Sequence, residues 1–394
     1  MPFQLVGPNF QKTYNPLPGP DFMIVDKQIF ELDRLELFSG ATLKQVRVGY
    51  ETYGRLSPAK DNAILICHYF SGTSHAAGRY NEVEKLPGYW DAVIGPNRPF
   101  DTDRYFIVSS DTLCNINVKD PRVVTTGPAS INPETGRPYG MSFPIITIRD
   151  FINVQHALIR SLGIERLHTV AGPSMGGFQA LEWALAYPET VERAILVISA
   201  GELHPWVIVM PGRVAEMAIR LDPNWQNGDY YGKAEPVEGL TLALTALTMI
   251  ALSQPWADRT LGRVPADPES SPSASLENRF LIETEIDKVA RERAAQTDAN
   301  SYIYLAKATS LYRAGIGFDT LEEALQRIRA KVLLIPCCSD LFLPPYQSER
   351  LLNALRQAGV TASSFELESD GGHLAGVWEI HKAAKILREF LESA

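Results

Sequence analysis

The chain has few cysteines, and they form no recognisable pattern. Only four of its 394 residues are cysteine, at positions 67, 114, 337 and 338, with no C-x-x-C pair and no cluster with histidine at zinc spacing. We therefore expect neither a redox role nor a bound metal. Cys67 and the pair at 337 and 338 lie in strand-like runs, where cysteine is expected to act as a small buried hydrophobic side chain.

Positive charge is also in the minority. Lysine and arginine number 37 against 46 aspartates and glutamates, which gives a formal net charge of −9. A basic surface is the mark of a nucleic-acid-binding domain, so we expect no nucleic-acid partner. An anionic substrate would need a local basic pocket, because the overall field does not attract it.

Long apolar runs are absent too. No run is long enough to span a bilayer, and the first residues lack the basic stretch and apolar stretch of a signal peptide. We therefore expect no membrane association, and residence in the cytoplasm.

What the chain does have is ordinary globular composition, 45% hydrophobic, in alternating strand-like and helix-like segments. Residues 22–53 alternate as antiparallel strands do. Helical patterns cover residues 150–162, capped by Asp150, and 175–187. Short apolar runs typical of buried parallel strands lie at 63–67, 105–108, 167–170, 194–198 and 332–336. This alternation predicts an α/β fold, with a mainly parallel sheet and helices on both faces.

One long segment interrupts the alternation. Between residues 201 and 318 strand-like runs disappear, and helical patterns dominate at 214–221, 239–252, 275–293 and 302–311. Residues 264–273, rich in proline and serine, read as an exposed loop. We predict a core domain made of residues 1–200 and 319–394, and a helical lid, residues 201–318, over the carboxyl-terminal edge of the sheet. A helix over about 377–391 closes the chain.

A serine stands among glycines where a strand-like run meets a helical pattern. Residues 170–177 read Val-Ala-Gly-Pro-Ser-Met-Gly-Gly, so Ser174 lies at the centre of a G-x-S-x-G motif. Five residues with three fixed occur by chance in many chains. The strand before and the helix after are, however, the context in which this motif forms a nucleophile elbow. Side chains in place of the two motif glycines would crowd the tight turn, so we predict that Ser174 is a nucleophile.

Two later residues supply the partners that such a serine needs. Asp340 follows the run 332–338, and His373 closes the sequence Asp370-Gly371-Gly372-His373. Ser, Asp, His is the chain order of the α/β-hydrolase triad. A serine hydroxyl attacks only when a base takes its proton, so His373 is the predicted base and Asp340 the acid that orients it. Asp370 is the rival acid because it is close to His373 in sequence, but Asp340 lies at the end of a strand on the expected edge.

A tetrahedral oxyanion needs two backbone N–H groups. One is expected from Met175, directly after the nucleophile and at the start of a helix. The other is expected from the loop after the first buried strand, residues 68–72, and we assign it to Phe70. The other reading of this loop is an ordinary strand-to-loop turn. His156 and His168, in a helical pattern and on a strand, are expected to be structural.

Further stretches resemble the homoserine O-acetyltransferase family of α/β-hydrolase enzymes. The resemblance covers most of the chain and includes residues 66–75, similar to the family's H-x-L-T-G-x-x-H loop, and the elbow around Ser174. Runs of this kind are specific for the family but say less about the substrate. The other matching stretches are residues 89–96, 101–106, 126–140, 143–144, 147–150, 222–225, 239–240, 301–302 and 339–340.

The resemblance implies an α/β-hydrolase fold with a helical lid, often dimeric through that lid, and a ping-pong reaction. Acetyl-CoA would acetylate Ser174 as a co-substrate, with no bound cofactor. A hydroxyl acceptor, homoserine in the type reaction, would then take the acetyl group. The expected partners are therefore a small-molecule acyl donor, a small-molecule acceptor and a second copy of the chain.

The chain departs from the family at three places where an acceptor or acyl group would be held. The family usually has an arginine where Glu216 stands, although Arg213 lies one helical turn away and could substitute. Together with Tyr69, these are the expected substrate-binding residues. Residues 113–121 replace a short Gly-Gly-rich run. After the base, Leu374 replaces the aspartate of a common His-Asp-x-Phe pattern.

Three functions remain open from the sequence. The leading one is an O-acetyltransferase whose acceptor need not be homoserine. The second is a serine hydrolase on the same scaffold, with water as acceptor, which needs the same triad and differs in how the lid excludes water. The third is a binding protein with a disabled site, against which the presence of Ser174, Asp340 and His373 argues.

Overall fold

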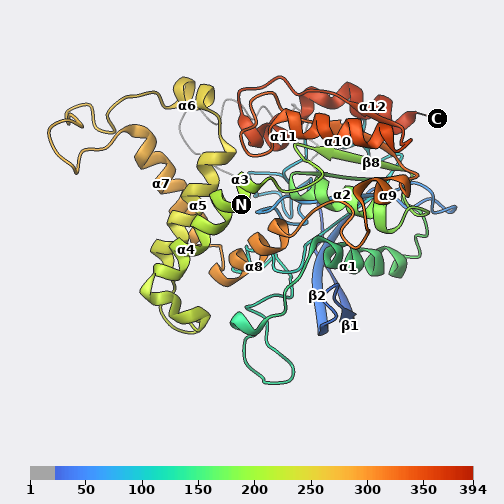
Figure 1. The fold of residues 1–394 in the computed structure, drawn as a ribbon, viewed down its shortest axis with the longest axis horizontal. Coiled ribbons are helices and arrows are strands. Elements are labelled where there is room, and N and C mark those ends of the chain that lie inside the picture. Colours follow the sequence, from blue (N-terminus) through green and yellow to red (C-terminus); the bar gives the residue numbers. More distant parts are fainter. Residues whose placement is uncertain (1–22, 394) are drawn as a thin grey trace.

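The apolar runs of the sequence form an eight-stranded sheet. In the computed structural model, which describes residues 23–393, the strand order is β1-β2-β6-β3-β7-β8-β9-β10 (Figure 1). The strands are β1 (Gln28–Glu36), β2 (Thr42–Tyr53), β3 (Ala63–Cys67), β6 (Phe106–Ser110), β7 (Thr169–Pro173), β8 (Arg193–Val197), β9 (Lys331–Ile335) and β10 (Ala362–Ser364). Two short strands, β4 (Ile94–Gly95) and β5 (Phe100–Asp101), pair separately.

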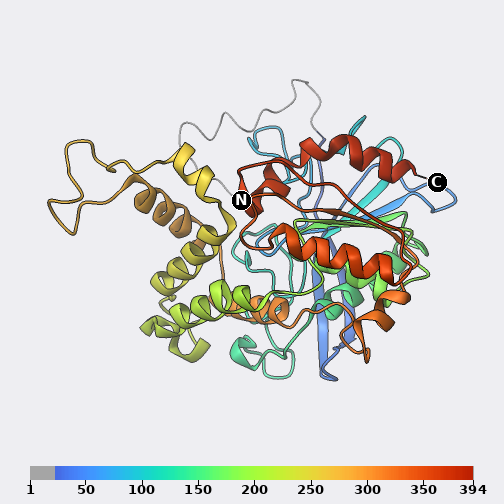
Figure 2. The same cartoon turned by 45° about the horizontal axis from the view of Figure 1, so that its top comes forward.

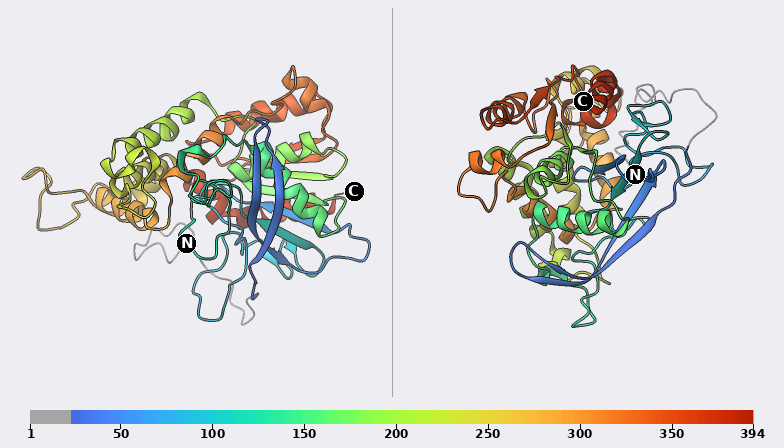
Figure 3. Two further views of the ribbon diagram at one scale, coloured as in Figure 1. Left: turned by 90° about the horizontal axis from the view of Figure 1, so that it is seen from below. Right: turned by 90° about the vertical axis from the view of Figure 1, so that its right-hand side faces the viewer.

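Only β2 runs against its neighbours. It pairs antiparallel with β1 and with β6, and every pairing from β6 to β10 is parallel. The long β1–β2 hairpin extends past one end of the parallel strands (Figure 3). The predicted mainly parallel α/β sheet is confirmed.

Alternate residues of the parallel strands face different helices, as the two-residue period of a strand requires. Leu65 and Leu196 belong to a core cluster with α1 (Ile148–Ser161), α2 (Met175–Ala186), α9 (Leu321–Gln326) and α10 (Pro345–Gln357). Ile66 and Val197 belong to a second cluster, with α12 (Ala384–Glu392). The sheet is therefore covered on both faces, and its strand ends lie between the two helical layers.

Helix boundaries differ from the sequence prediction where side chains change the capping. Helix α1 begins at Ile148 rather than at Asp150, because Asp150 lies in the first turn and accepts the Thr147 N–H at 2.7 Å. The expected last helix is interrupted. It consists of α11 (Ala375–Trp378), a 3₁₀ turn and α12, and the carbonyl of Gly376 accepts the indole N–H of Trp90 at 3.0 Å.

Residues 201–318 contain helices and no strand of the main sheet. They are α3 (Pro205–Val207), α4 (Val214–Leu221), α5 (Val237–Ala251), α6 (Gln254–Thr260), α7 (Leu281–Ala294) and α8 (Ala299–Ser310). Helices α4 to α7 project from the side of the sheet at which the carboxyl ends of its strands lie, and α8 lies between them and the sheet (Figures 1 and 2). Helix α7 begins later than expected, since the Glu283 carboxylate accepts the Phe280 N–H at 2.8 Å and caps the helix there.

Two composition-based expectations can be compared with the structure. All four cysteines are free thiols. Of the three that were expected to be buried, Cys67 and Cys337 are, whereas Cys338, which lies past the end of β9, is exposed; Cys114 is buried as well. Among residues 23–393, no single helix is both long and apolar enough to cross a membrane. Only α5 and α6 taken together, with a bend of 101° between them, reach that length and composition.

Candidate active site

Ser174 lies in the sharp turn between β7 and α2. Its backbone has φ 56° and ψ −119°, a region that residues other than glycine rarely occupy. The glycines around it leave no room for a side chain. A Cβ on Gly172 would lie 2.4 Å from the Cys67 carbonyl oxygen, and one on Gly176 would lie 2.1 Å from the same atom. The turn is therefore held tightly against the end of β3, and it raises Ser174 above the sheet edge.

His373 and Asp340 reach Ser174 from two other loops. The Nε2 atom of His373 lies 2.7 Å from Ser174 Oγ, and its Nδ1 atom lies 2.7 Å from Asp340 Oδ2. All three residues are at least nine-tenths buried. The other Asp340 oxygen accepts the N–H groups of Phe342 and Leu343 at 2.8 and 3.0 Å, which fixes the carboxylate. The structure thus brings these three predicted residues together.

Asp370, the rival acid, faces away from the imidazole. Its two carboxylate oxygens accept from Arg259 of α6 at 2.6 and 2.8 Å. This ion pair lowers the pKa of Asp370. Asp370 therefore ties the loop that carries His373 to the helical segment, and of the two aspartates Asp340 is the one hydrogen-bonded to the imidazole.

The two expected oxyanion donors border one cavity with Ser174. Met175 is the first residue of α2, where helix N–H groups have no partner within the helix. Phe70 lies in the turn after β3, and its ring packs edge-on against Tyr302 with centroids 5.3 Å apart. Both residues line the same small cavity as Ser174, of about 40 Å³.

The cavity at Ser174 is mainly apolar. Its walls come from the core and from the helical segment, and none of the described residues that line it carries a charge. They include Phe178, Leu203, Val207, Leu247, Tyr302, Ala306 and Phe342, with hydroxyls from Thr309 and Ser310. The Phe342 ring also stacks on the His373 imidazole, with centroids 4.7 Å apart. This wall restricts how the imidazole can move.

The expected substrate-binding residues do not gather at this cavity. Arg213 and Glu216 form an ion pair of 2.9 Å on one side of α4, and Glu216 also accepts from Arg220 at 2.7 Å. The two arginines lower the pKa of Glu216 against the opposing effect of burial, so its charge is neutralised locally. Neither Arg213 nor Glu216 lines the Ser174 cavity.

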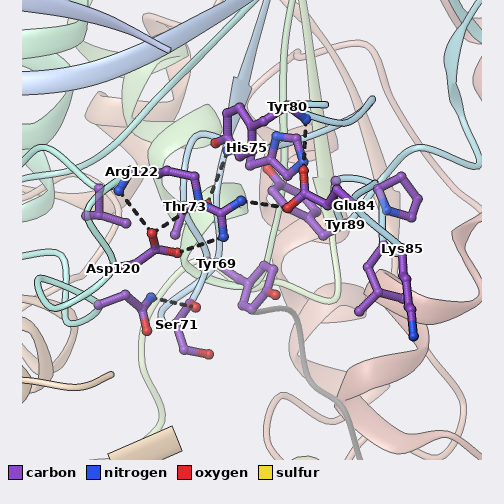
Figure 4. A pocket seen from close by; sticks show the side chains of 16 residues that line it. Tyr69, Ser71, Thr73, His75, Tyr80, Glu84, Lys85, Tyr89, Asp120 and Arg122 are labelled. Carbon is purple, nitrogen blue, oxygen red and sulfur yellow. Dashed lines mark hydrogen bonds and ion pairs between the residues drawn. The ribbon is translucent and has the colours of Figure 1, made fainter. Parts of the chain in front are cut away.

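Tyr69 borders a second cavity, of about 270 Å³, on the other side of the turn after β3 (Figure 4). Burial raises the pKa of Tyr69 to about 12. Across this cavity Arg122 bonds to Glu84 at 2.6 Å and to Asp120 at 3.2 Å, and its guanidinium lies over the Tyr80 ring. These charges are satisfied by one another. Among the described residues, no group of three or more His, Cys, Asp or Glu is placed to hold a metal ion.

Comparison with known proteins identifies the family to which this site belongs. A model of the α/β hydrolase fold matches residues 120–380. The homoserine O-acetyltransferase of Deferribacter desulfuricans is 40% identical over 369 residues, which cover 94% of this chain and 96% of that protein. The chain belongs to the homoserine O-acetyltransferase family of α/β hydrolases.

Solved structures of similar proteins include a transferase and an esterase. Homoserine O-acetyltransferase from Bacillus anthracis is 43% identical with a TM-score of 0.90, and the match covers 94% of this chain and 98% of that one. Esterase E22 is 45% identical with a TM-score of 0.88, over 94% of this chain and all of that one. A leucine-to-aspartate variant of that esterase, 44% identical, has a TM-score of 0.89.

The expected fold, family and class of enzyme are confirmed by this membership. The chain is an acyl-transferring enzyme of the α/β-hydrolase fold. Its relatives include proteins named for transfer to homoserine and one named for ester hydrolysis. Membership of the family therefore establishes acyl transfer as the class of reaction, but it does not identify the molecule that accepts the acyl group.

Several residues of this site carry no motif of their own and were not predicted. Arg293 of α7 donates to Thr248 Oγ1 at 3.0 Å and acts electrostatically on Tyr69 and Tyr302, so a positive charge lies near the turn after β3. Burial lowers the pKa of Arg293 to about 10, which leaves it charged at neutral pH. Asn115 and Asn117, in the segment that departs from the family pattern, bond to that turn. In the sequence, the only signal for the two asparagines is that residues 113–121 differ from the family pattern.

Proposed function

We propose that this enzyme transfers a short acyl group through a covalent ester on Ser174. His373 takes the proton of the Ser174 hydroxyl as the oxygen attacks an acetyl thioester such as acetyl-CoA, and returns it to the departing thiol. Asp340 keeps the imidazole proton on Nδ1 and stabilises the imidazolium. The observation that carries the proposal is the pair of 2.7 Å contacts that link Ser174 through His373 to Asp340.

The second half-reaction reverses the first. The acceptor hydroxyl gives its proton to His373 Nε2 as its oxygen attacks the acyl carbon, and Ser174 recovers a proton when the ester bond breaks. In both halves negative charge develops on the carbonyl oxygen of the acyl group. We propose that the N–H groups of Phe70 and Met175 stabilise it, supported by their place beside Ser174 in one cavity.

The size of the cavity supports a short acyl group. A volume of about 40 Å³ has room for only a few water-sized groups, since one water needs roughly 10–15 Å³ on this measure. An acetyl group has three heavy atoms and meets this limit. A long acyl chain would have to displace side chains of the helical segment, so acetyl-CoA is the donor that we propose.

The acceptor divides two candidate functions. A hydroxyl compound of the homoserine type is supported by the relatives named for that transfer. Hydrolysis is supported by the 45% identity to an esterase, by Leu374 after the base, and by the lining of the cavity, in which no charged side chain among the described residues faces the carboxylate of an amino acid. We favour transfer to a hydroxyl acceptor and keep water as the alternative.

A partition experiment tests this choice. The enzyme is mixed with acetyl-CoA and a panel of hydroxyl acceptors that includes homoserine, and transferred acetyl is measured against free acetate. We expect one acceptor to divert most of the acetyl from water, and Ser174→Ala to abolish both products. Release of acetate alone, whatever the acceptor, would instead assign the enzyme as a hydrolase.

The variant Leu374→Asp refines the partition experiment. It restores the residue that the family commonly has directly after the base, at a buried position beside His373. We expect a higher ratio of transfer to hydrolysis with homoserine. An unchanged ratio would place acceptor selection elsewhere in the site.

We further propose that residues 201–318 act as a lid and form the contact between two copies of the chain. Helices α4 and α5 expose an apolar stripe at helical spacing: Val214, Met217, Leu221, Leu242 and Met249 are 39, 45, 78, 58 and 43% exposed. Leu221, Leu242 and Met249 of this stripe line a groove of about 1040 Å³ between α4, α5 and α7. Apolar patches of this kind mark association surfaces.

We also propose that the protein resides in the cytoplasm. This is supported by its free thiols, which suit a reducing compartment.

A further inference from the structure

The turn after β3 is held by hydrogen bonds from three side chains. We name residues 69–73 the oxyanion turn. Its carbonyl oxygens bond as follows: that of Tyr69 to His68 Nδ1 at 2.7 Å, that of Ser71 to Asn117 Nδ2 at 3.1 Å, and that of Gly72 to Asn115 Nδ2 at 3.0 Å. Three carbonyls of one short turn are therefore fixed by three side chains. In Figure 4 the dashed line that ends at the labelled Ser71 marks the bond that its carbonyl oxygen accepts.

The hydrogen bonds of His68 define its tautomer. The backbone N–H of Thr112 donates to Nε2 at 3.1 Å, so Nε2 is an acceptor. A neutral imidazole then carries its proton on Nδ1, which donates to the Tyr69 carbonyl. His68 is fully buried, and burial lowers its pKa, which favours this neutral form. The Thr112 N–H can only donate to Nε2, and the Tyr69 carbonyl can only accept from Nδ1.

Fixing the Tyr69 carbonyl also fixes the next amide. A trans peptide unit is planar, and its C=O and N–H bonds point in opposite directions. The Tyr69 carbonyl is bound by His68 Nδ1 and also by the Gly72 N–H at 2.9 Å. The Phe70 N–H, on the other side of the same peptide unit, must then point away from His68. The Phe70 side chain beside it lines the Ser174 cavity.

We propose that His68 is a positioning residue for acyl transfer, and that it acts by orienting the Phe70 N–H toward the carbonyl oxygen of the acyl group on Ser174. Asn115 and Asn117 support it by holding the rest of the oxyanion turn. The proposal rests on the proposed function of Ser174. Both asparagines lie in residues 113–121, the segment that replaces the family's Gly-Gly-rich run.

The asparagines form one unit with His68. Asn115 is fully buried, and its Nδ2 also lies 3.5 Å from His68 Nε2. Its Oδ1 accepts the backbone N–H of Asn117 at 3.0 Å. A glycine at either position would leave a carbonyl of the turn without its side-chain donor. We therefore expect loss of Asn115 to act on the same catalytic step as loss of His68, and less strongly.

The test compares His68→Ala with the conservative His68→Asn, whose Nδ2 occupies the place of Nδ1. The substrate is p-nitrophenyl acetate, and the second readout is inhibition by an aryl trifluoromethyl ketone, which forms a charged tetrahedral adduct with a nucleophilic serine. We expect His68→Ala to lower kcat by about 10²-fold with little change in KM, as loss of an oxyanion donor does. The affinity for the ketone should fall by a similar factor, and His68→Asn should recover much of both.

The control is His168→Ala, which removes a histidine immediately before β7, away from the turn. It should leave kcat and ketone affinity near the wild-type values. Wild-type kcat and ketone affinity in His68→Ala would overturn the proposal, as would equal losses in His168→Ala. If His68→Ala does not fold, Asn115→Ala is measured instead, and wild-type values of both readouts in that variant would overturn the proposal. Failure of the wild-type enzyme to acylate Ser174 would instead refute the proposed function, so the two failures are distinguishable.

Discussion

At the scale of single residues, the site depends on one strained backbone position. Ser174 has a positive φ of 56°, and non-glycine residues in such positions persist only where the surrounding structure holds them. The Ser174 N–H donates to the Val197 carbonyl at 2.8 Å, and its own carbonyl accepts from Ser199 Oγ at 3.0 Å. Strands β7 and β8 therefore hold the nucleophile in place before any substrate binds.

Asp340 and Asp370 allow a matched test of the acid that orients His373. Because, of these two, only Asp340 is hydrogen-bonded to the imidazole, Asp340→Asn should lower kcat by about 10⁴-fold, the order expected when the histidine loses its correct tautomer. Asp370→Asn breaks the pair with Arg259 and should change kcat only a few-fold. Steady-state kinetics on one ester substrate measures both. A larger loss in Asp370→Asn would reverse the assignment.

Residue types and chain order were enough to predict that Ser174, His373 and Asp340 lie close together, because strand ends at one sheet edge bring their loops together. They were not enough to predict Asn115, Asn117 or Arg293. The asparagines bond to main-chain carbonyls across 43 and 46 residues of sequence, and no spacing rule connects such partners. Glu216 shows the same limit in reverse: the sequence marks it as a departure, but only the structure reveals its ion pairs with Arg213 and Arg220.

At the scale of elements, the buried parallel strands were predicted to within three residues and the helices less well. Strand β3 coincides with its apolar run, whereas α7 starts six residues later than expected and α10 was not anticipated. A strand buried on both faces is an uninterrupted apolar run. Helix ends depend on caps such as that of Glu283 on Phe280, and many side chains can supply a cap.

His168 gives the fold a predictable dependence on pH. Burial, and next the charge of Arg193, lower its pKa to about 4 from an ordinary 6.5. Above pH 6.5 the histidine is neutral in both the folded and the unfolded chain. As the pH falls from 6.5 to 4, the unfolded chain takes up a proton that the folded one does not, so the free energy of unfolding decreases. His168→Gln removes this contribution.

Urea unfolding at pH 7 and pH 4.5 measures the effect of His168. The loss of unfolding free energy between the two pH values should be smaller in His168→Gln than in the wild type. Because other groups titrate in both proteins, only the difference between them is interpreted. An identical loss in both would show that His168 is not buried in its neutral form.

At the scale of the whole molecule, the helical segment carries both a wall of the active site and the exposed apolar stripe on α4 and α5. If two copies meet through this stripe, Leu242→Lys should convert a dimer to a monomer, because the charge would be buried in the contact. Leu276→Lys is the matched control, since Leu276 is 89% exposed in a loop of the same segment. Size-exclusion chromatography with light scattering measures the mass of each.

A wild-type protein that is monomeric would contradict the proposed contact. So would a dimer that survives Leu242→Lys, because the stripe would then lie outside the interface. Sequence alone predicted that residues 201–318 are mainly helical. It did not predict the stripe, because each of these apolar residues would also suit a buried face, and only the packing of α4 and α5 leaves them exposed.

The whole mechanism depends on passage of the acyl group through Ser174. To detect the acyl-enzyme, the protein is mixed with acetyl-CoA in the absence of an acceptor and quenched with acid, and its peptides are examined by mass spectrometry. We predict one acetyl group on the peptide that contains Ser174, and none in Ser174→Ala. Turnover of acetyl-CoA with no adduct on Ser174, or with full activity in Ser174→Ala, would contradict the mechanism.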